Sequence, residues 1–271
     1  MRRQPLNDEE WSKIQHLMPS NDGRGRNYRD HREVVGGIIW AMRSGARWRD
    51  IPEEQFAPWT TCYSRYRNWV QSGFWKELFQ RLNGLRQRVD HLDWSANFVD
   101  GTTIPVHHKA TGGSPSSEAL GLSRGGLTTK VHVRIDREGH LLNVEVTEGQ
   151  RQELTVYKTL MNNGAVHNPC GRPKLRPEAV VGDKGYNAGW AHDWNHRKHM
   201  ASVIPKYDSQ TKKGPFQQDL YRERNLVERT IGHLKEFRRV AFRVEKLAEH
   251  YEANWLIAEI VRSLSDIEQP L

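Results

Sequence analysis

Over about the first 90 residues, apolar side chains recur at the three- and four-residue spacing of amphipathic helices, and polar or glycine-containing turns separate the repeats. The pattern predicts one helix after Asn7, which offers an N-cap before an acidic first turn, and a second over residues 29–44, ended by Gly45. A third helix is expected to start at Pro58, and a fourth to cover residues 74–89. The first part of the chain is therefore predicted to be all-α.

Arginines and tryptophans are prominent in this helical part. Arg65 and Arg67 are expected to project from the third helix, because Cys62, Tyr66 and Trp69 occupy its apolar face. Short helices with projecting arginines fit a helix-turn-helix module, whose second helix enters a DNA major groove. A helical packing domain with a solvated basic face explains the same pattern. Seven of the ten tryptophans lie within the first 95 residues, and such residues are more typical of core anchors than of base-stacking platforms.

From residue 97 the pattern changes to alternating positions and short apolar runs, which are typical of strands. Strands interleaved with helices predict an α/β domain. We therefore expect a helical domain over residues 1–92 and an α/β domain over residues 93–271. The expected strands cover 98–104, 128–135, 141–146, 179–182 and 202–204, and the expected helices lie near 153–161, 220–239 and 247–264.

Composition limits the classes of partner. The net charge of +8 and the pI of about 9.5 favour an anionic partner, such as nucleic acid or an acidic membrane surface. No run of apolar residues is long enough to span a bilayer, and the N-terminus does not have the pattern of a signal peptide. Cys62 and Cys170 are far apart, which indicates a reducing compartment and no structural zinc site.

The segment 221–235 carries an unusual set of polar residues. On one continuous helix, Tyr221, Arg224, Glu228 and Lys235 would fall within an arc of about 60°. A solvated face of salt bridges is the common explanation for such a pattern, but it accounts poorly for the tyrosine and for the excess of positive charge. A phosphodiester bound beside a metal-binding carboxylate would need that excess.

Two aspartates are candidate partners for Glu228. Asp100 lies inside an apolar strand, where an uncompensated charge is costly, so a metal ion or a hydrogen-bond network must compensate it. Asp183 follows a buried strand, at the end where α/β sheets bind ligands, although an isolated aspartate at such a position is more often a helix cap. Three carboxylates together form the hard oxygen ligand set that Mg²⁺ prefers.

The chain resembles the insertion sequence 5 family of bacterial transposases, which have an Asp-Asp-Glu active site. The resemblance extends from about residue 6 to residue 262. The spacing Tyr221-x2-Arg224-x3-Glu228-x6-Lys235 matches the C-terminal motif of such enzymes. The segments that resemble further family motifs are Leu6–Trp11, Trp48–Pro52, Val99–Thr103, Ser123–Lys130 and Gly182–Tyr186.

The resemblance implies a ribonuclease-H-like catalytic fold, with Asp100 on the first strand, Asp183 after the fourth and Glu228 on a late helix. This triad would hold two Mg²⁺ ions, for which Mn²⁺ is the expected substitute. Tyr221, Arg224 and Lys235 would contact flanking phosphates, and Arg65 and Arg67 are candidate contacts of the helical domain. Related transposases often insert a large β-domain before the glutamate, and residues 184–227 leave no room for it.

The implied activity is cleavage of double-stranded DNA at the terminal inverted repeats of the element and joining of the 3′-hydroxyl ends to target DNA. A homodimer or larger synaptic complex in the bacterial cytoplasm, associated with the nucleoid and not with a membrane, is the expected setting. A non-catalytic DNA-binding regulator is one alternative. A structure-specific nuclease of the same fold, which cuts without joining, is the other.

Histidines offer a different kind of candidate site. His192, His196 and His199 have the i, i+4, i+7 spacing that can place three imidazoles on one helix face, as a zinc site requires. The arginines and tryptophans of the same segment favour a solvated amphipathic helix instead. The pair His107 and His108 is interpreted as a polar strand end.

Overall fold

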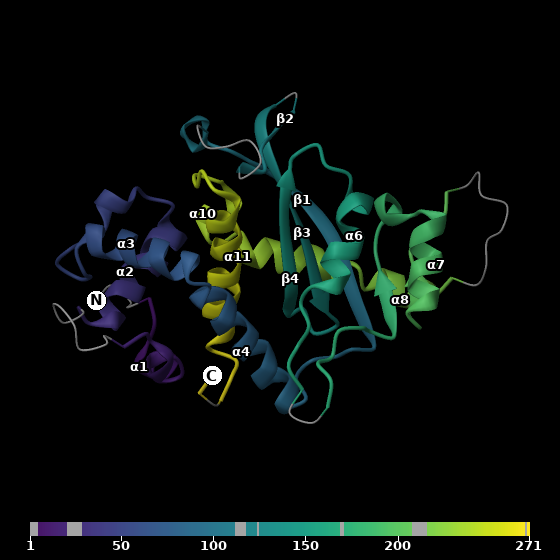
Figure 1. The fold of residues 1–271 in the computed structure, drawn as a ribbon, viewed down its shortest axis with the longest axis horizontal. Helices are drawn as coiled ribbons and strands as arrows, with labels where there is room; N and C mark the ends of the chain where they lie inside the picture. Colours follow the sequence, from purple (N-terminus) through teal and green to yellow (C-terminus); the bar gives the residue numbers. More distant parts are fainter. Residues whose placement is uncertain are drawn as a thin grey trace.

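The computed structural model describes residues 5–20, 29–111, 118–123, 125–168, 171–207, 216–268 and 270–271. A mixed sheet lies at its centre, with α6 and α7 on one side and the N-terminal helices, α10 and α11 on the other (Figure 1). Arg124 and Cys170 lie outside the described residues, whereas Cys62 is buried as a free thiol. Within the described ranges, no helix has both the length and the apolarity needed to cross a membrane.

The sheet joins an antiparallel meander to two parallel strands. In the meander, β3 pairs antiparallel with both β1 and β4, and on its other edge β1 pairs parallel with β5, which pairs parallel with β6. This is the strand order of the ribonuclease-H-like fold, so the predicted α/β class is confirmed. The strands are β1 (Ala96–Pro105), β2 (Gly121–Ser123), β3 (Gly126–Asp136), β4 (Leu141–Glu148), β5 (Ala179–Val181) and β6 (Ala201–Val203).

The N-terminal part is helical, as predicted. Asn7 and Glu10 form a capping box at the start of α1, and Gly45 ends α2 in the left-handed conformation, with φ of 69°. The elements of this part are α1 (Asp8–Ser12), η1 (Gln15–Leu17), α2 (His31–Ser44), η2 (Trp48–Asp50), α3 (Trp59–Gln71) and α4 (Phe74–Arg88).

The prediction of one long helix over residues 220–239 is wrong, because the chain forms three shorter helices there. The first break falls at Glu223, whose carboxylate accepts two hydrogen bonds of 2.7 Å from Arg137 in the turn between β3 and β4. This non-local pairing joins the segment between α8 and α9 to the turn between β3 and β4. The helices after the meander are α6 (Glu153–Asn162), α7 (Gly189–Arg197), α8 (Gln218–Arg222), α9 (Asn225–Leu234), α10 (Arg238–Ala241) and α11 (Ala248–Ser263). Of the short 3-10 turns, η3 (His108–Ala110) follows β1 and η4 (Lys184–Tyr186) follows β5.

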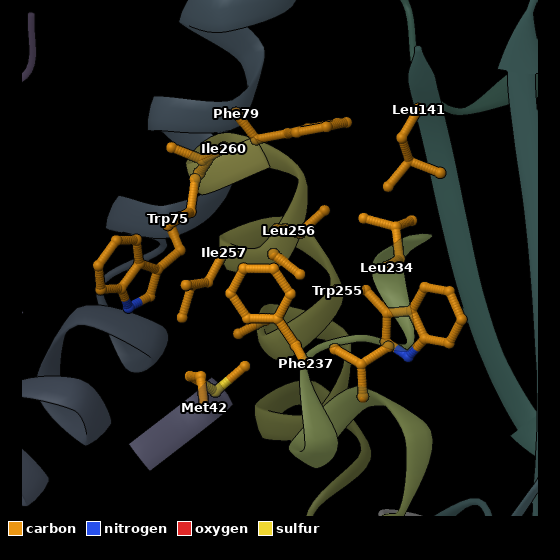
Figure 2. Packing of buried hydrophobic residues seen from close by; sticks show 14 of the residues in the cluster. Met42, Trp75, Phe79, Leu141, Leu234, Phe237, Trp255, Leu256, Ile257 and Ile260 are labelled. Atoms are coloured by element: carbon orange, nitrogen blue, oxygen red, sulfur yellow. The ribbon is translucent and has the colours of Figure 1, made fainter. Parts of the chain in front are cut away.

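One hydrophobic core connects the N-terminal helices to the sheet. Figure 2 shows Trp255, Leu256 and Ile257 of α11 among Trp75 of α4 and Leu234 of α9. Helix α11 is buried on nearly all of its faces, because it passes between the N-terminal helices and the sheet. Trp69 and Trp75 are buried in this core, as expected of tryptophans that act as anchors. The division into domains at residue 92 remains a prediction.

Candidate active site

Asp100 lies in the middle of β1, the central strand of the sheet. Its side chain is 17% exposed, and Oδ1 accepts a hydrogen bond of 2.8 Å from the backbone N–H of Gly101. Because side chains alternate along a strand, Asp100 and Thr102 share one face of the sheet. Burial removes most water from this carboxylate and therefore disfavours its charged form.

Asp183 follows β5 directly and lies at the same level of the sheet. The parallel register pairs Phe98 with Val181, and its continuation brings Asp183 beside Asp100. Oδ1 of Asp183 accepts a hydrogen bond of 2.8 Å from Gly185 N–H and caps η4. Asp183 can therefore cap η4 and still lie beside Asp100, as a catalytic role requires.

Glu228 approaches the same sheet face from α9. Val227, Ile231 and Leu234 are buried beneath this helix, and Glu228 itself is 49% exposed. Arg224 lies one turn earlier: its Nη2 donates to Oε1 of Glu228 at 2.5 Å, and its Nη1 lies 3.7 Å from Oδ2 of Asp100. One guanidinium thus bridges two of the three predicted catalytic carboxylates.

The three carboxylates interact electrostatically. The pKa of Asp100 is raised to about 6, mainly by burial. Gly101 N–H and the charge of Arg224 oppose this shift, whereas the charges of Asp183 and Glu228 add to it. Burial opposes the charge of Arg224, but Asp100 and Glu228 outweigh it and raise the pKa of the guanidinium. The site therefore concentrates negative charge that a cation would relieve.

The chemistry of the donors fits a divalent metal ion. Asp100, Asp183 and Glu228 are all carboxylates, which are the ligands of Mg²⁺ and Mn²⁺. In the described part of the chain, no three His, Cys, Asp or Glu side chains converge closely enough to enclose a metal ion as they stand. Since Arg224 pairs with both Asp100 and Glu228, full coordination requires this guanidinium to give up its contacts.

The remaining residues of the C-terminal motif are arranged differently from the single-helix prediction. Lys235 ends α9, and its Nζ donates a hydrogen bond of 2.8 Å to Oγ1 of Thr102, on the same face as Asp100. Burial lowers the pKa of Lys235, and the charge of Asp100 opposes that shift. Tyr221 lies on the separate helix α8, where its ring contacts Phe216 at 5.3 Å between centroids.

An ion pair that the sequence did not reveal adjoins the carboxylates. Lys130 of β3 contacts Glu153 in the first turn of α6. A Cβ placed on Gly185 would lie 2.9 Å from Oδ1 of Asp183 and 3.4 Å from Oε2 of Glu153, so Glu153 is a close neighbour of the Asp183 turn. The sequence offered one indication of this pair: Lys130 ends the segment 123–130, which resembles a family motif.

The predicted DNA contacts of the helical part lie on α3. Arg67 is exposed and places its guanidinium 5.8 Å from the ring centroid of Tyr63. Arg65 is half-buried, and its charge acts on His31. Both arginines therefore belong to the helical region and not to the carboxylate site.

His192 of α7 has two local partners. His192 contacts Ser202 Oγ at 2.8 Å and Asn187 Oδ1 at 2.9 Å, so both of its ring nitrogens are engaged. His199 follows the helix, with φ of 59°. The rings of His107 and His108 pack 4.2 Å apart at the end of β1, close to the predicted polar strand end.

Family models match most of the chain. Residues 6–79 match "Putative transposase of IS4/5 family" and residues 95–260 match "Transposase DDE domain". The insertion element IS402 uncharacterized 16.2 kDa protein of Burkholderia cepacia is 32% identical over 110 residues, which cover 38% of this chain and 75% of that protein. The uncharacterized protein y4sN of Sinorhizobium fredii is 30% identical over 108 residues, which cover 40% of this chain and 81% of that protein.

Among solved structures, two complexes of Mos1 align over most of the chain. The Mos1 strand transfer complex covers 91% of this chain and 78% of that chain, at 12% identity and a TM-score of 0.30. The alignment with the Mos1 mariner paired end complex with Mn covers 95% of this chain and 83% of that chain, at 12% identity and a TM-score of 0.31.

Proposed function

Because this chain belongs to the DDE transposase family, we propose that it cuts double-stranded DNA at the terminal inverted repeats of its own insertion element and joins the 3′-hydroxyl ends to target DNA. The observation that carries the proposal is the set of three carboxylates from β1, the turn after β5, and α9. Asp183 and Glu228 both raise the pKa of Asp100, which means that the three charges act on one another.

Asp100, Asp183 and Glu228 would hold the divalent ion, Mg²⁺ or its substitute Mn²⁺, with two ions per site as the expected number. When bound, such ions activate the attacking oxygen of water or of a DNA 3′-hydroxyl and stabilise the leaving oxygen. Asp100 binds a cation only when deprotonated, so the burial that raises its pKa couples metal affinity to pH.

The basic residues of the site position the DNA. Arg224 and Lys235 present a planar guanidinium and an ammonium beside the carboxylates, and both can hold phosphate oxygens that flank the scissile bond. Tyr221 can add a phenolic hydrogen bond at the edge of this phosphate track. Once Arg224 pairs with a phosphate, its hold on Asp100 and Glu228 weakens, which frees both carboxylates for metal.

The helical region would supply contacts outside the cleavage site. Arg65 and Arg67 on α3 are its proposed DNA contacts, and a helix-turn-helix placement of α2 and α3 is the corresponding docking mode. Since joining two element ends to one target requires two active sites close together, we expect a homodimer or larger synaptic complex.

The test is incubation of the full chain with Mg²⁺ and labelled DNA that carries the element ends beside a supercoiled target plasmid. Cleaved ends together with joined products support the transposase. Cleavage without joining supports the structure-specific nuclease, and binding without cleavage supports the regulator. The triad variant Asp100→Asn is the control, because it should abolish every product while DNA binding persists.

A further inference from the structure

One pocket in the described part of the chain places the rings of Trp48, Tyr63 and Tyr66 beside several exposed cations. This pocket, of about 530 Å³, lies where η2 and α3 meet the chain segment that leads into α11. Its wall includes Trp48, Tyr63, Arg67, Lys109, Lys246 and His250. We call it the junction pocket, because its residues come from both the helical region and the C-terminal part.

Aromatic rings form one wall of the junction pocket. Trp48 packs against Tyr63 at 5.4 Å and against Tyr66 at 5.0 Å between ring centroids. The hydroxyl of Tyr66 donates to the backbone carbonyl of His250 at 2.8 Å, which ties this wall to α11. Tyr63 is 37% exposed on this fixed support, and the Arg67 guanidinium lies 5.8 Å from the centroid of its ring. Such a ring is suited to stacking of a planar base.

Cations surround the aromatic wall. Arg67, Lys109 and Lys246 are exposed, and none of them has an ion pair with another described residue. The other two cations of the pocket are already paired: Arg239 with Glu245 at 2.8 Å and Arg47 with Asp50 at 3.0 Å. Three positive charges thus remain for an anionic ligand.

We propose that the junction pocket binds an unpaired nucleotide of the DNA substrate, with the base stacked on Tyr63 and the adjacent phosphates held by Lys109 and Lys246. Paired bases in a duplex hide their faces from protein rings, so stacking on Tyr63 requires an unpaired or extruded base. The pocket volume of about 530 Å³ lies in the range of small-molecule binding sites, so the pocket can hold one nucleotide. The inference rests on the proposed function, because it assigns a second contact to the same DNA.

The pocket is connected to the carboxylates by β1. From Asp100 the chain follows β1 to Pro105 and reaches Val106, which forms a parallel bridge with Arg243. His107 N–H donates to the carbonyl of Arg243 at 2.8 Å, next to the pocket segment. Six strand residues span about 20 Å at about 3.3 Å each. One DNA strand rises about 3.4 Å per nucleotide, so the pocket would engage a nucleotide about six positions from the scissile phosphate.

The experiment measures affinities of the full chain, in EDTA, for two labelled DNAs of equal length: a complete duplex and a duplex with an unpaired tail. Tyr63→Ala should weaken binding of the tailed DNA by about tenfold, since stacking of one base contributes about 1–3 kcal/mol, and leave duplex binding unchanged. Tyr63→Phe retains the ring and should restore the affinity. Arg88→Ala, which removes an exposed arginine at the end of α4, is the matched control.

Cross-linking provides an independent readout. A photoreactive thymidine analogue placed in the unpaired tail should cross-link to the segment 59–71 of the wild-type chain. An equal loss of affinity for both DNAs in Tyr63→Ala, or cross-links elsewhere only, would overturn the proposal. Its failure is distinguishable from failure of the proposed function, because cleavage and joining of element ends are measured separately with Mg²⁺.

Discussion

Arg224 donates a hydrogen bond of 2.5 Å from Nη2 to Oε1 of Glu228, and its other amino group lies 3.7 Å from Asp100. One cation from the start of α9 thereby balances carboxylates on a helix and on the central strand. Under the proposed function, a divalent ion and DNA phosphates would take over this balance of charge. Exchange of Arg224 between carboxylates and phosphate would couple DNA binding to completion of the metal site.

Asp100→Asn, Asp183→Asn and Glu228→Gln should each reduce cleavage of element-end DNA by more than about 100-fold, because even residues that merely support metal ligands contribute 10–100-fold. Binding of the same DNA in EDTA should stay within a few-fold of wild type. The measurement is a gel assay of nicked product beside a mobility shift. A variant that still cleaves removes its residue from the proposed triad.

The position of Asp100 predicts an effect on stability. Its pKa is raised from 3.8 to about 6, mainly by burial, so the folded state disfavours the charged form. Stability from the neutral carboxyl is present below about pH 4 and is lost as pH rises through 6. In EDTA at pH 7.5, Asp100→Asn should therefore increase the free energy of unfolding by up to about 3 kcal/mol.

Urea denaturation at pH 3.5 and pH 7.5 tests this sign. The increase in the free energy of unfolding caused by Asp100→Asn should disappear at pH 3.5, where the wild-type carboxyl is neutral. Asp219→Asn, which changes an exposed aspartate on α8, should show no such difference. Equal effects of Asp100→Asn at both pH values would show that the folded state does not disfavour the charged carboxylate at this position.

Local patterns in the sequence predict the sheet and the two aspartates well. Alternation around Asp100 and the apolar run before Asp183 depend on neighbouring residues only, so their strand positions follow directly from the sequence. The order of the meander and the parallel strands then brings these two residues together. Glu228 follows from helix periodicity combined with the family motif.

Contacts between distant segments could not be predicted in the same way. The break at Glu223 depends on Arg137, and the pair of Lys130 with Glu153 depends on how α6 crosses the sheet. Hydrophobic periodicity is still satisfied when a helix is broken by such a partner, so the sequence alone favoured one long helix. Because of that break, Tyr221 lies on α8 and Glu228 lies on α9.

Lys235→Ala should weaken DNA binding through the loss of one phosphate contact. Each phosphate neutralised by a cation contributes about 0.9 to the slope of log affinity against log salt on duplex DNA, so the slope should fall by about this amount. Fluorescence anisotropy over a salt series measures it, with Lys235→Arg expected to retain most of the slope. An unchanged slope for the alanine variant would count against a phosphate contact.

The buried pair of Arg86 and Glu259 predicts how tightly α4 and α11 are joined. Arg86 Nη1 lies 2.9 Å from Glu259 Oε1, and both side chains are almost completely buried. Burial opposes the charge of Glu259, but Arg86 and Arg262 outweigh it and lower the pKa of the carboxyl. Glu259→Gln leaves Arg86 with a buried, uncompensated charge and should reduce the free energy of unfolding by about 3–5 kcal/mol.

Removal of both charges should be much less harmful than removal of one. The double variant Arg86→Met with Glu259→Leu should regain most of the lost stability, because packed apolar side chains often replace a buried ion pair without cost. Glu77→Gln breaks the exposed pair with Arg81 on α4 and should change stability by less than about 1 kcal/mol. Urea denaturation of the four proteins compares these values. If Glu259→Gln and Glu77→Gln lose equal stability, the buried pair does not hold α4 and α11 together.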